Sequence, residues 1–483
     1  MIPDSTPRRV ALVHDWLTTY VGGERVLEQM IDLYPGAEVY TSIDVLEEHE
    51  RGFLQGRRPV TSFAQHWPLM RRHYRHFLPL LMLAIEQLDV RDSELVLSSS
   101  ASIGKGVLTG PDQLHIAYVH SPMRYAWDLQ HEYLRDANLT RGMRGLLARW
   151  MLHKARLWDT RTANGVDHFI ANSQFIARRI WKTYRREATV IHPPVDVEGF
   201  ALREHKEDFY LTASRLVPYK KVPLIAEAFR ALPGRRLVIV GSGGDMPKLK
   251  SLAGPNVEIL GYQPTAVLRD LMQRAKAFVF AAEEDFGIAP VEAQACGTPV
   301  IAYARGGALE TVRGPGHSRP TGVFFGAQTA AAIAAAVEEF ERRGERITAH
   351  ACRDSAMRFS IDAFRERYAR YVLAVLVLVY VLNFLDRQIL SILAERIKAD
   401  LQISDAQMGY LYGTAFAIFY AVFGIPLGRL ADAWDRRRLI AIGLTAWSVM
   451  TSLSGLARGF AGLALARVGV GVGEAALSPS AYS

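Results

Sequence analysis

Short apolar runs alternate with helical patterns along the first 370 residues of the chain. The clearest runs are Val10–Val13, Glu38–Thr41, Leu95–Ser98, His115–Val119, Asp167–Ala171, Phe209–Ala213, Leu237–Val240 and Val257–Gly261. Apolar strands that alternate with helices are typical of a parallel sheet covered on both faces. The pattern therefore predicts an α/β fold built from doubly wound units.

Residues 278–302 are the stretch of the sequence that most clearly suggests a ligand-binding site. They predict a strand, a loop, a helix and a second strand, with the regular elements at Ala277–Ala281, Pro290–Cys296 and Pro299–Tyr303. A loop between the carboxyl end of a strand and a helix N-terminus is where open α/β sheets bind ligands, and the free N–H groups there favour phosphate. Glu284 and Glu292 lie on either side of this loop, and Glu292 can accept hydrogen bonds from sugar or ribose hydroxyls.

This stretch resembles the donor-site signature of retaining glycosyltransferases of family four, which have the two-domain GT-B fold. The family pattern, roughly E-G-F-G-L-P-x-x-E-A-M-A-C-G-x-P-V-I-A, is matched by Glu284, Phe286, Gly287, Pro290, Glu292, Ala293, Ala295, Cys296, Gly297, Pro299, Val300, Ile301 and Ala302. Asp285 stands where the family has its first glycine, and Ala289 stands where it has its proline. The resemblance covers about residues 8–370.

The resemblance implies two Rossmann-like domains that face a cleft. The first is expected over 1–190, on the acceptor side, and it also receives a terminal helix over about 355–370. The second is expected over 191–354 and binds the nucleotide sugar. The boundary falls where Val190–Asp196, predicted as a strand, runs into the rigid turn at Pro193 and Pro194.

Further motifs match the family at separate positions. Ser214–Lys221 resembles its Gly-Arg-Leu-x-x-x-Lys-Gly segment, and Arg305–Glu310 resembles its Gly-Gly-x-x-Glu turn. His120–Tyr125 is similar to a segment of mannosyltransferase-like members that build bacterial surface polysaccharides. Two glycines open a predicted helix after Val21, in a loop one residue shorter than the family's.

Roles follow from these matches. The resemblance implies that Arg215 and Lys220 hold the donor diphosphate, where two cations neutralise charge on the leaving group. It implies that Glu284 and His120 contact the donor sugar and that Glu292 binds ribose. The remaining donor-binding positions are expected at Gly22, Gly23, Phe286, Gly287, Gly306, Gly307 and Glu310.

The resemblance thus implies an enzyme that transfers a hexose with retention and without a metal or other cofactor. The expected donor is GDP-mannose, and the expected acceptor is lipid-linked or a polysaccharide in cell-envelope glycan synthesis. A UDP-sugar donor is the alternative within enzymes. A GT-B module that binds a nucleotide without turnover is a further alternative.

Composition narrows the possible partners. The formal charge is +8, but no dense basic stripe is present, so nucleic acid is not an expected partner. Cys296 and Cys352 lack the spacing of metal ligands. A basic, aromatic helical run from Arg141 to Arg161 suits an anionic membrane surface or a lipid-pyrophosphate acceptor. An ordinary solvated helix face explains that run equally well.

The chain becomes strongly apolar from Tyr371. The apolar stretches predict about four transmembrane helices, at Tyr371–Leu385, Met408–Leu427, Leu439–Leu456 and Phe460–Leu477. Gly428–Arg438 is similar to the cytoplasmic signature loop of the major facilitator superfamily, so a partial transporter of this type is expected over 371–483. Its first helix is expected to continue to about Ala394.

A complete carrier of that superfamily has about twelve spans, so we expect a truncated carrier fused to the enzyme. A sequence-assembly joint and a retained membrane anchor are the alternatives, and a membrane transporter is the second class of function. The basic triplet Arg436–Arg438 places its loop inside by the positive-inside rule. We therefore expect a multi-pass protein of the inner (plasma) membrane, with its enzyme domain in the cytoplasm.

Overall fold

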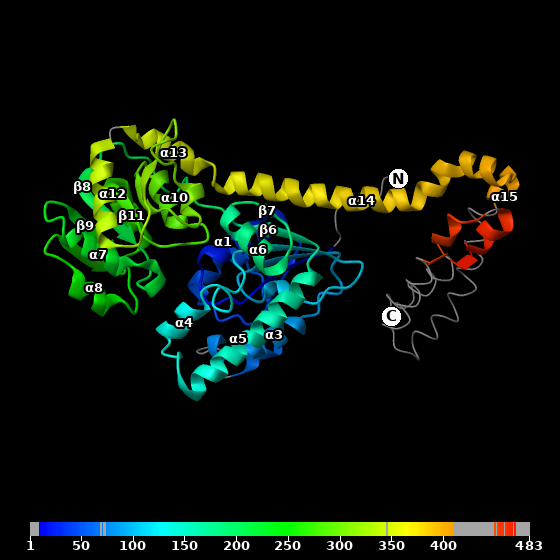
Figure 1. Cartoon of the computed structure of the whole chain (residues 1–483), viewed down its shortest axis with the longest axis horizontal. Helices are drawn as coiled ribbons and strands as arrows, with labels where there is room; N and C mark the ends of the chain where they lie inside the picture. Colours follow the sequence, from blue (N-terminus) through cyan, green and yellow to red (C-terminus); the bar gives the residue numbers. More distant parts are fainter. Residues whose placement is uncertain are drawn as a thin grey trace. The chain divides into compact units, whose positions relative to one another are not determined.

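The chain divides into two compact units, Met1–Val372 and Leu373–Ser483. The computed structural model describes residues 9–67, 70, 74–343, 346–409, 449–450, 452–457, 459–466 and 468–469. The first unit contains two parallel sheets with helices packed against them (Figure 1). This is the predicted GT-B-like α/β architecture.

The first sheet has the strand order β3-β2-β1-β4-β5-β6-β7, and its described strands pair in parallel. The strands are β1 Val10–His14, β2 Glu38–Thr41, β3 Val60–Thr61, β4 Leu95–Ser100, β5 Leu114–Val119, β6 His168–Ala171 and β7 Ala188–Val190. β1, β4 and β5 are buried along nearly their whole length, which explains their continuous apolar character.

Helices connect these strands. They are α1 Gly22–Leu33, η1 Glu48–Leu54, η2 Phe63–His66, η3 Tyr74–Phe77, α3 Leu78–Glu86, η4 Gly104–Gly106, α4 Gln130–Asp136, α5 Gly142–Thr162, η5 Ala163–Gly165 and α6 Gln174–Tyr184. Helix α6 begins after Ser173, whose hydroxyl accepts the N–H of Ile176. Such a cap satisfies one of the free N–H groups of the first turn.

The second sheet has the order β10-β9-β8-β11-β12-β13 and is also parallel. Its strands are β8 Glu207–Ala213, β9 Arg236–Val240, β10 Val257–Gly261, β11 Ala275–Phe280, β12 Val300–Tyr303 and β13 Gly322–Phe325. Its helices are η6 Pro218–Lys220, α7 Val222–Arg230, α8 Met246–Leu252, α9 Thr265–Arg274, α10 Ile288–Ala295, α11 Ala308–Thr311, α12 Ala330–Arg343 and α13 Ala349–Met357.

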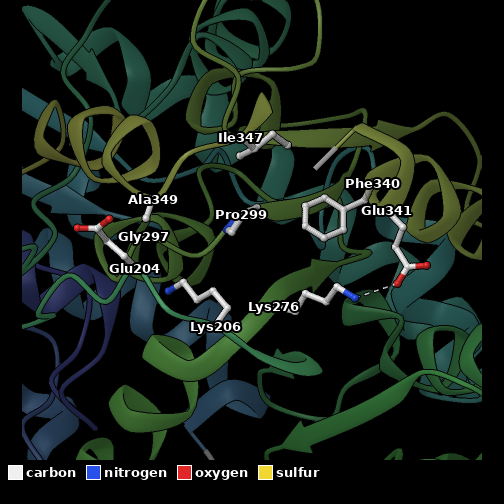
Figure 2. Close-up of a pocket in the computed structure, with 9 residues that line it drawn as sticks. All are labelled: Glu204, Lys206, Lys276, Gly297, Pro299, Phe340, Glu341, Ile347 and Ala349. Carbon is white, nitrogen blue, oxygen red and sulfur yellow. Dashed lines mark hydrogen bonds and ion pairs between the residues drawn. The ribbon is translucent and has the colours of Figure 1, made fainter. Parts of the chain in front are cut away.

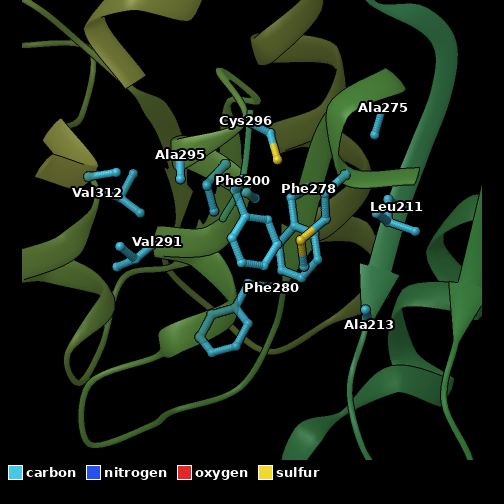
Figure 3. Close-up of a cluster of buried hydrophobic side chains, with 14 of the residues drawn as sticks. Phe200, Leu211, Ala213, Ala275, Phe278, Phe280, Val291, Ala295, Cys296 and Val312 are labelled. Atoms are coloured by element: carbon cyan, nitrogen blue, oxygen red, sulfur yellow. The ribbon is translucent and has the colours of Figure 1, made fainter. Parts of the chain in front are cut away.

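Successive residues of a strand in this sheet pack into two different hydrophobic cores, one on each face of the sheet. Phe209 and Leu211 of β8 pack on one face with Val291 of α10 and Cys296, in the cluster shown in Figure 3. Tyr210, between them, packs on the other face with residues of α7 and α12. Side chains of a strand alternate between the faces of a sheet, so each face needs its own layer of helices.

Each sheet reverses its strand order beside its first strand. β1 lies between β2 and β4, and β8 lies between β9 and β11. Helical connections leave on opposite faces at such a switch point, and the loops there leave room for a ligand beyond the carboxyl ends of the strands. The residues that follow β1, β4, β8 and β11 are therefore the positions to search for a site.

The helix α14 runs from Ile361 to Leu401, and α15 covers Asp405–Gly409. No helix within the described residues combines the length and apolar content needed to cross a bilayer. Much of the predicted spans Met408–Leu427, Leu439–Leu456 and Phe460–Leu477 lies outside the described residues. The four transmembrane helices therefore stay a prediction.

Candidate active site

Two cations and a carboxylate gather where β8 and β11 end. Lys220, in η6, forms an ion pair with Glu284, which follows β11, and both side chains are mostly buried, at 16% and 17% exposure. Arg215 follows β8, is exposed, and donates from Nη2 to the Tyr219 hydroxyl at 3.4 Å. The Tyr219 ring centroid lies 5.5 Å from the Lys220 Nζ. Three residues predicted to contact the donor thus share one location.

The charge state of Lys220 is sensitive to this crowding. Burial, together with the positive charges of Arg215 and Arg124, lowers the pKa of Lys220 to about 7. A lysine in such a position gains from a further anion, since a bound phosphate would stabilise its charged form.

Asp285 joins the second sheet's loop to the first domain. Its carboxylate pairs with Arg124, which lies after β5, and with Arg179 of α6, whose Nη1 lies 3.1 Å from Asp285 Oδ1. Arg179 also pairs with Asp128, and the guanidinium of Arg124 lies 6.0 Å from the ring centroid of Tyr219. Asp285, which stands where the family has a glycine, therefore binds two arginines of the first domain.

His120 follows β5 in the first domain and is partly buried. Its Nε2 lies 2.9 Å from the Ser99 hydroxyl. Burial, with the nearby positive charge of His14, lowers the pKa of His120 to about 3. The ring is therefore neutral near pH 7, and it can serve a sugar as a hydrogen-bonding group rather than as a cation.

The pKa of His14, at the end of β1, is shifted in the opposite direction. Burial alone would lower its pKa, but the hydrogen bond and charge of Glu24 raise the pKa of His14 above its usual value. Its Nε2 lies 3.4 Å from Glu24 Oε1, and its Nδ1 is buried with no hydrogen-bond partner in the described part of the chain. A Cβ at Gly23 would lie 3.5 Å from the His14 ring and 3.7 Å from His120 Nε2.

Glu292 occupies the first turns of α10 and is 10% exposed in its side chain. Its Oε1 lies 3.0 Å from Nη1 of Arg25, in α1 of the first domain. The neighbouring Gly22 also approaches α10, since a Cβ there would lie 3.1 Å from the Ile288 side chain. The start of α1 and the start of α10 are thus in contact across the two sheets.

Glu310, predicted to bind the donor, contacts the first domain in the structure. Its carboxylate accepts the backbone N–H groups of Gln174 and Phe175, at 2.9 and 3.1 Å, and lies 3.0 Å from His192 Nε2. Burial alone would raise its pKa, but these contacts lower the pKa of Glu310. Glu310 therefore caps the N-terminus of α6 and links the two domains; its donor-binding role stays a prediction.

The predicted glycines and Phe286 shape the loop after β11. Gly287 has φ 88° and directly precedes α10. A Cβ on Gly306 would lie 2.3 Å from the Glu284 carbonyl oxygen, and one on Gly307 would lie 2.4 Å from the Phe286 Cα. The Phe286 ring is buried against His192, 5.6 Å between centroids. These glycines let one loop pass closely over another, which larger residues would prevent.

The structure brings Arg215, Lys220, Glu284 and Asp285 together, and it places His120 with Gly23 at the corresponding edge of the first sheet. Sequence reasoning gave no role to Arg124 and Arg179, which pair with Asp285. It also gave none to Arg25, which pairs with Glu292, or to His14. Arg124 and His14 each follow a predicted strand, which is the one signal that could have marked them.

A cavity of about 280 Å³ lies elsewhere in the second domain. It is near the amino ends of β8, β11 and β12, and Figure 2 shows Lys206 and Lys276 at its wall. Lys206 donates to two carbonyl oxygens and to Thr298, and Lys276 pairs with Asp208 and Glu341. Open α/β sheets bind ligands beyond the carboxyl ends of their strands, so this cavity, at the amino ends, is the less suitable phosphate site.

Comparison with family models divides the chain in the same way. Residues 22–198 match the model of Glycosyltransferase Family 4, residues 178–358 match Glycosyl transferases group 1, and residues 376–483 match the Major Facilitator Superfamily. The fold and the two enzyme models define residues 22–358 as a GT-B glycosyltransferase of group 1 and family 4.

Curated relatives support both parts. A D-inositol 3-phosphate glycosyltransferase of Mycobacterium marinum is 28% identical over 184 residues, which cover 32% of this chain and 39% of that protein. An MFS-type efflux pump of Mycolicibacterium smegmatis is 43% identical over 122 residues, or 25% of this chain and 28% of the pump. The chain thus spans well under half of each of these relatives.

Solved structures support the fold. HepE of Anabaena, in complex with UDP, superposes with a TM-score of 0.56 at 17% identity, over 76% of this chain and 100% of that one. Sucrose-phosphate synthase of Thermosynechococcus elongatus superposes with a TM-score of 0.57 at 16% identity, over 76% of this chain and 99% of that one.

Proposed function

We propose that this chain transfers a hexose, with retention, from a nucleoside diphosphate sugar to a lipid-linked or polysaccharide acceptor. The observation that carries the proposal is the grouping of Arg215, Lys220 and Glu284 beyond the β8 and β11 strand ends. Ligands of open α/β sheets bind at this kind of position. The two cations would hold the diphosphate, and Glu284 and His120 would contact the sugar.

The reaction would need no general base from the protein. The bond between the sugar C1 and the leaving phosphate oxygen breaks, and a bond from C1 to the acceptor oxygen forms on the same face. The leaving phosphate takes the acceptor hydroxyl's proton. Arg215 and Lys220 stabilise the negative charge that develops on the diphosphate, which is the main electrostatic demand of the step.

GDP-mannose is our first choice of donor. The support is the segment His120–Tyr125, which resembles mannosyltransferase-like members of the family. A UDP-sugar is the second choice, and it is favoured by the HepE structures, which are complexes with UDP and UDP-glucose. Neither proposed reaction requires a metal or other cofactor.

Thermal stabilisation by nucleotides is the direct test. The full chain in mild detergent would be melted with GDP, UDP or ADP, and with GDP-mannose and UDP-glucose. A ligand that binds only the folded state raises its stability by an amount set by its concentration relative to the dissociation constant. We expect a shift with GDP and GDP-mannose that exceeds the shift with the other nucleotides.

The outcomes separate the alternatives. Selective stabilisation by UDP and UDP-glucose would show that the donor is a UDP-sugar and not GDP-mannose. Nucleotide binding without transfer to any acceptor would indicate an inactive module. A folded protein that shifts with no nucleotide would refute the proposed function.

Nucleotide affinity should also depend on pH through Lys220. The pKa of Lys220 is lowered to about 7, so its ammonium is lost as the pH rises above that value. GDP binding favours the charged form, so affinity should fall as the pH increases and binding should take up a proton. Isothermal titration calorimetry in buffers of different ionisation enthalpy measures both effects.

Lys220→Arg is the matched variant for this experiment. An arginine stays charged over the same range, so the affinity of the variant should change less with pH. An equally steep pH dependence in both proteins would assign the effect to another group.

The region after residue 370 is proposed to hold the protein in the inner (plasma) membrane with the enzyme on the cytoplasmic side. The match of residues 376–483 to the Major Facilitator Superfamily supports membrane association. Protease protection of the C-terminal region in right-side-out vesicles would test this arrangement.

A further inference from the structure

Helix α5 exposes a stripe of large apolar side chains. Met143, Leu146, Leu147, Trp150 and Leu157 are between 54% and 78% exposed. With 3.6 residues per turn, they fall on one side of the helix. The buried residues of α5 fall on the opposite side, where the helix packs on its own domain; they are Gly145, Ala155, Asp159 and Thr162.

The exposed side of α5 is positively charged. Arg144, Arg149 and Lys154 are exposed, and none pairs with a carboxylate in the described part of the chain. The acidic residue of this helix, Asp159, is fully buried and pairs with Lys105 at 2.8 Å. The exposed face therefore combines apolar side chains with cations and lacks a negative charge of its own.

Neighbouring elements carry more exposed apolar surface. α3 contacts α5 and lies beside it in Figure 1, and its Leu83 is exposed. Trp67, just after η2, is also exposed, and η2 contacts α3. Soluble proteins rarely leave contiguous apolar surface uncovered unless it binds something.

We propose that the exposed face of α5 docks on an anionic lipid bilayer. Trp150, with the Lys154 ammonium 5.7 Å from its ring centroid, is an arrangement suited to the headgroup level, where aromatic rings are amphipathic anchors. Arg144 and Arg149 would meet lipid phosphates, since basic residues near an anionic surface each add to the attraction. Apolar contact and charge together provide the two signals that stable peripheral binding requires.

This inference does not depend on the donor site or on the region after residue 370. It concerns which face of the first domain meets the membrane, and it would hold even if another donor or reaction were found. A bilayer fits the face better than a second copy does, because an identical face would bring Arg144, Arg149 and Lys154 against their own copies.

A fluorescent probe on α5 tests the proposal in the full chain. Leu147→Cys can be labelled selectively with a nitrobenzoxadiazole dye, because Cys296 and Cys352 are buried. The labelled protein would be reconstituted in phosphatidylcholine vesicles with and without phosphatidylglycerol, and quenching by nitroxide-labelled lipids measured. Val267→Cys, an exposed apolar position of α9 in the second domain, is the matched control.

We expect quenching at residue 147 to exceed that at residue 267 several-fold, only in vesicles that contain phosphatidylglycerol. Adding Arg149→Glu and Lys154→Glu should abolish this excess while the circular dichroism spectrum is unchanged. Equal quenching at the two positions, or quenching that ignores the anionic lipid, would overturn the proposal. A blue-shifted but unquenched probe in a larger oligomer would instead assign the face to a second copy.

Discussion

Replacing Arg215 by alanine is expected to lower the rate of glycosyl transfer by about 10²- to 10³-fold, the loss typical when one donor to a developing negative charge is removed. Arg215 is exposed and donates to Tyr219, so the fold should tolerate the change. The turnover number of the purified protein, with the donor identified by thermal stabilisation, provides the measurement.

Arg236→Ala is the control for this experiment. Arg236 is also an exposed arginine, at the amino end of β9, where it pairs with Glu258 at 2.7 Å. It lies at the opposite end of the same sheet, so turnover should be near normal. If Arg215→Ala and Arg236→Ala have the same turnover, Arg215 does not hold the diphosphate.

Replacing Lys105 by methionine is expected to reduce the free energy of unfolding by about 3–5 kcal/mol, as when one partner of a buried ion pair is removed. Lys105 and Asp159 are 1% and 0% exposed, with 2.8 Å between Nζ and Oδ1. The Lys105 Nζ also donates to Thr162 Oγ1 at 2.9 Å. Without it the Asp159 carboxylate stays buried without its counter-ion.

Urea unfolding of the full chain in detergent, followed by circular dichroism, measures this loss. A combined Lys105→Met and Asp159→Asn variant should recover part of it, because no unpaired charge remains in the core. Arg91→Ala breaks the exposed pair with Asp89 and should change little. A Lys105→Met protein as stable as Arg91→Ala would show that the buried pair is not important for stability.

Local pattern predicts the sheets of this chain well. Glu38–Thr41 and Val257–Gly261 were predicted with the bounds that β2 and β10 have. Val190–Asp196 was predicted as a strand, but β7 ends at Val190, because pairing with β6 stops there and the prolines cannot continue a ladder. Where a strand ends depends on the segment it pairs with, so the sequence of one segment predicts its end only in part.

Helix ends show the effect of single residues. The helix predicted from Pro290 begins two residues earlier, at Ile288, because Gly287 adopts a left-handed conformation and ends the loop there. The terminal helix predicted over about 355–370 begins at Ile361 and continues to Leu401. No glycine or proline occurs between these residues, so the change in composition at Tyr371 does not interrupt the helix.

The site could be predicted only in part. The family motifs predicted the roles of Arg215, Lys220 and Glu284, which lie in loops that follow strands. They gave no indication that Asp285 pairs with Arg124 and Arg179, since these partners are far away in sequence and meet only through the fold. The contact of Glu310 with the start of α6 was hidden for the same reason.

Lys220, Glu284 and Glu292 of the donor site are already in ion pairs, whereas Arg215 donates to the Tyr219 hydroxyl. Lys220 contacts Glu284, and Glu292 contacts Arg25. A nucleotide sugar that binds Lys220 would therefore displace an internal counter-ion, exchanging one ion pair for another instead of neutralising a free charge. Screening by salt weakens both pairings, so we expect the part of the donor affinity that comes from Lys220 to vary little with ionic strength, and small anions such as chloride or sulfate to compete poorly for this lysine.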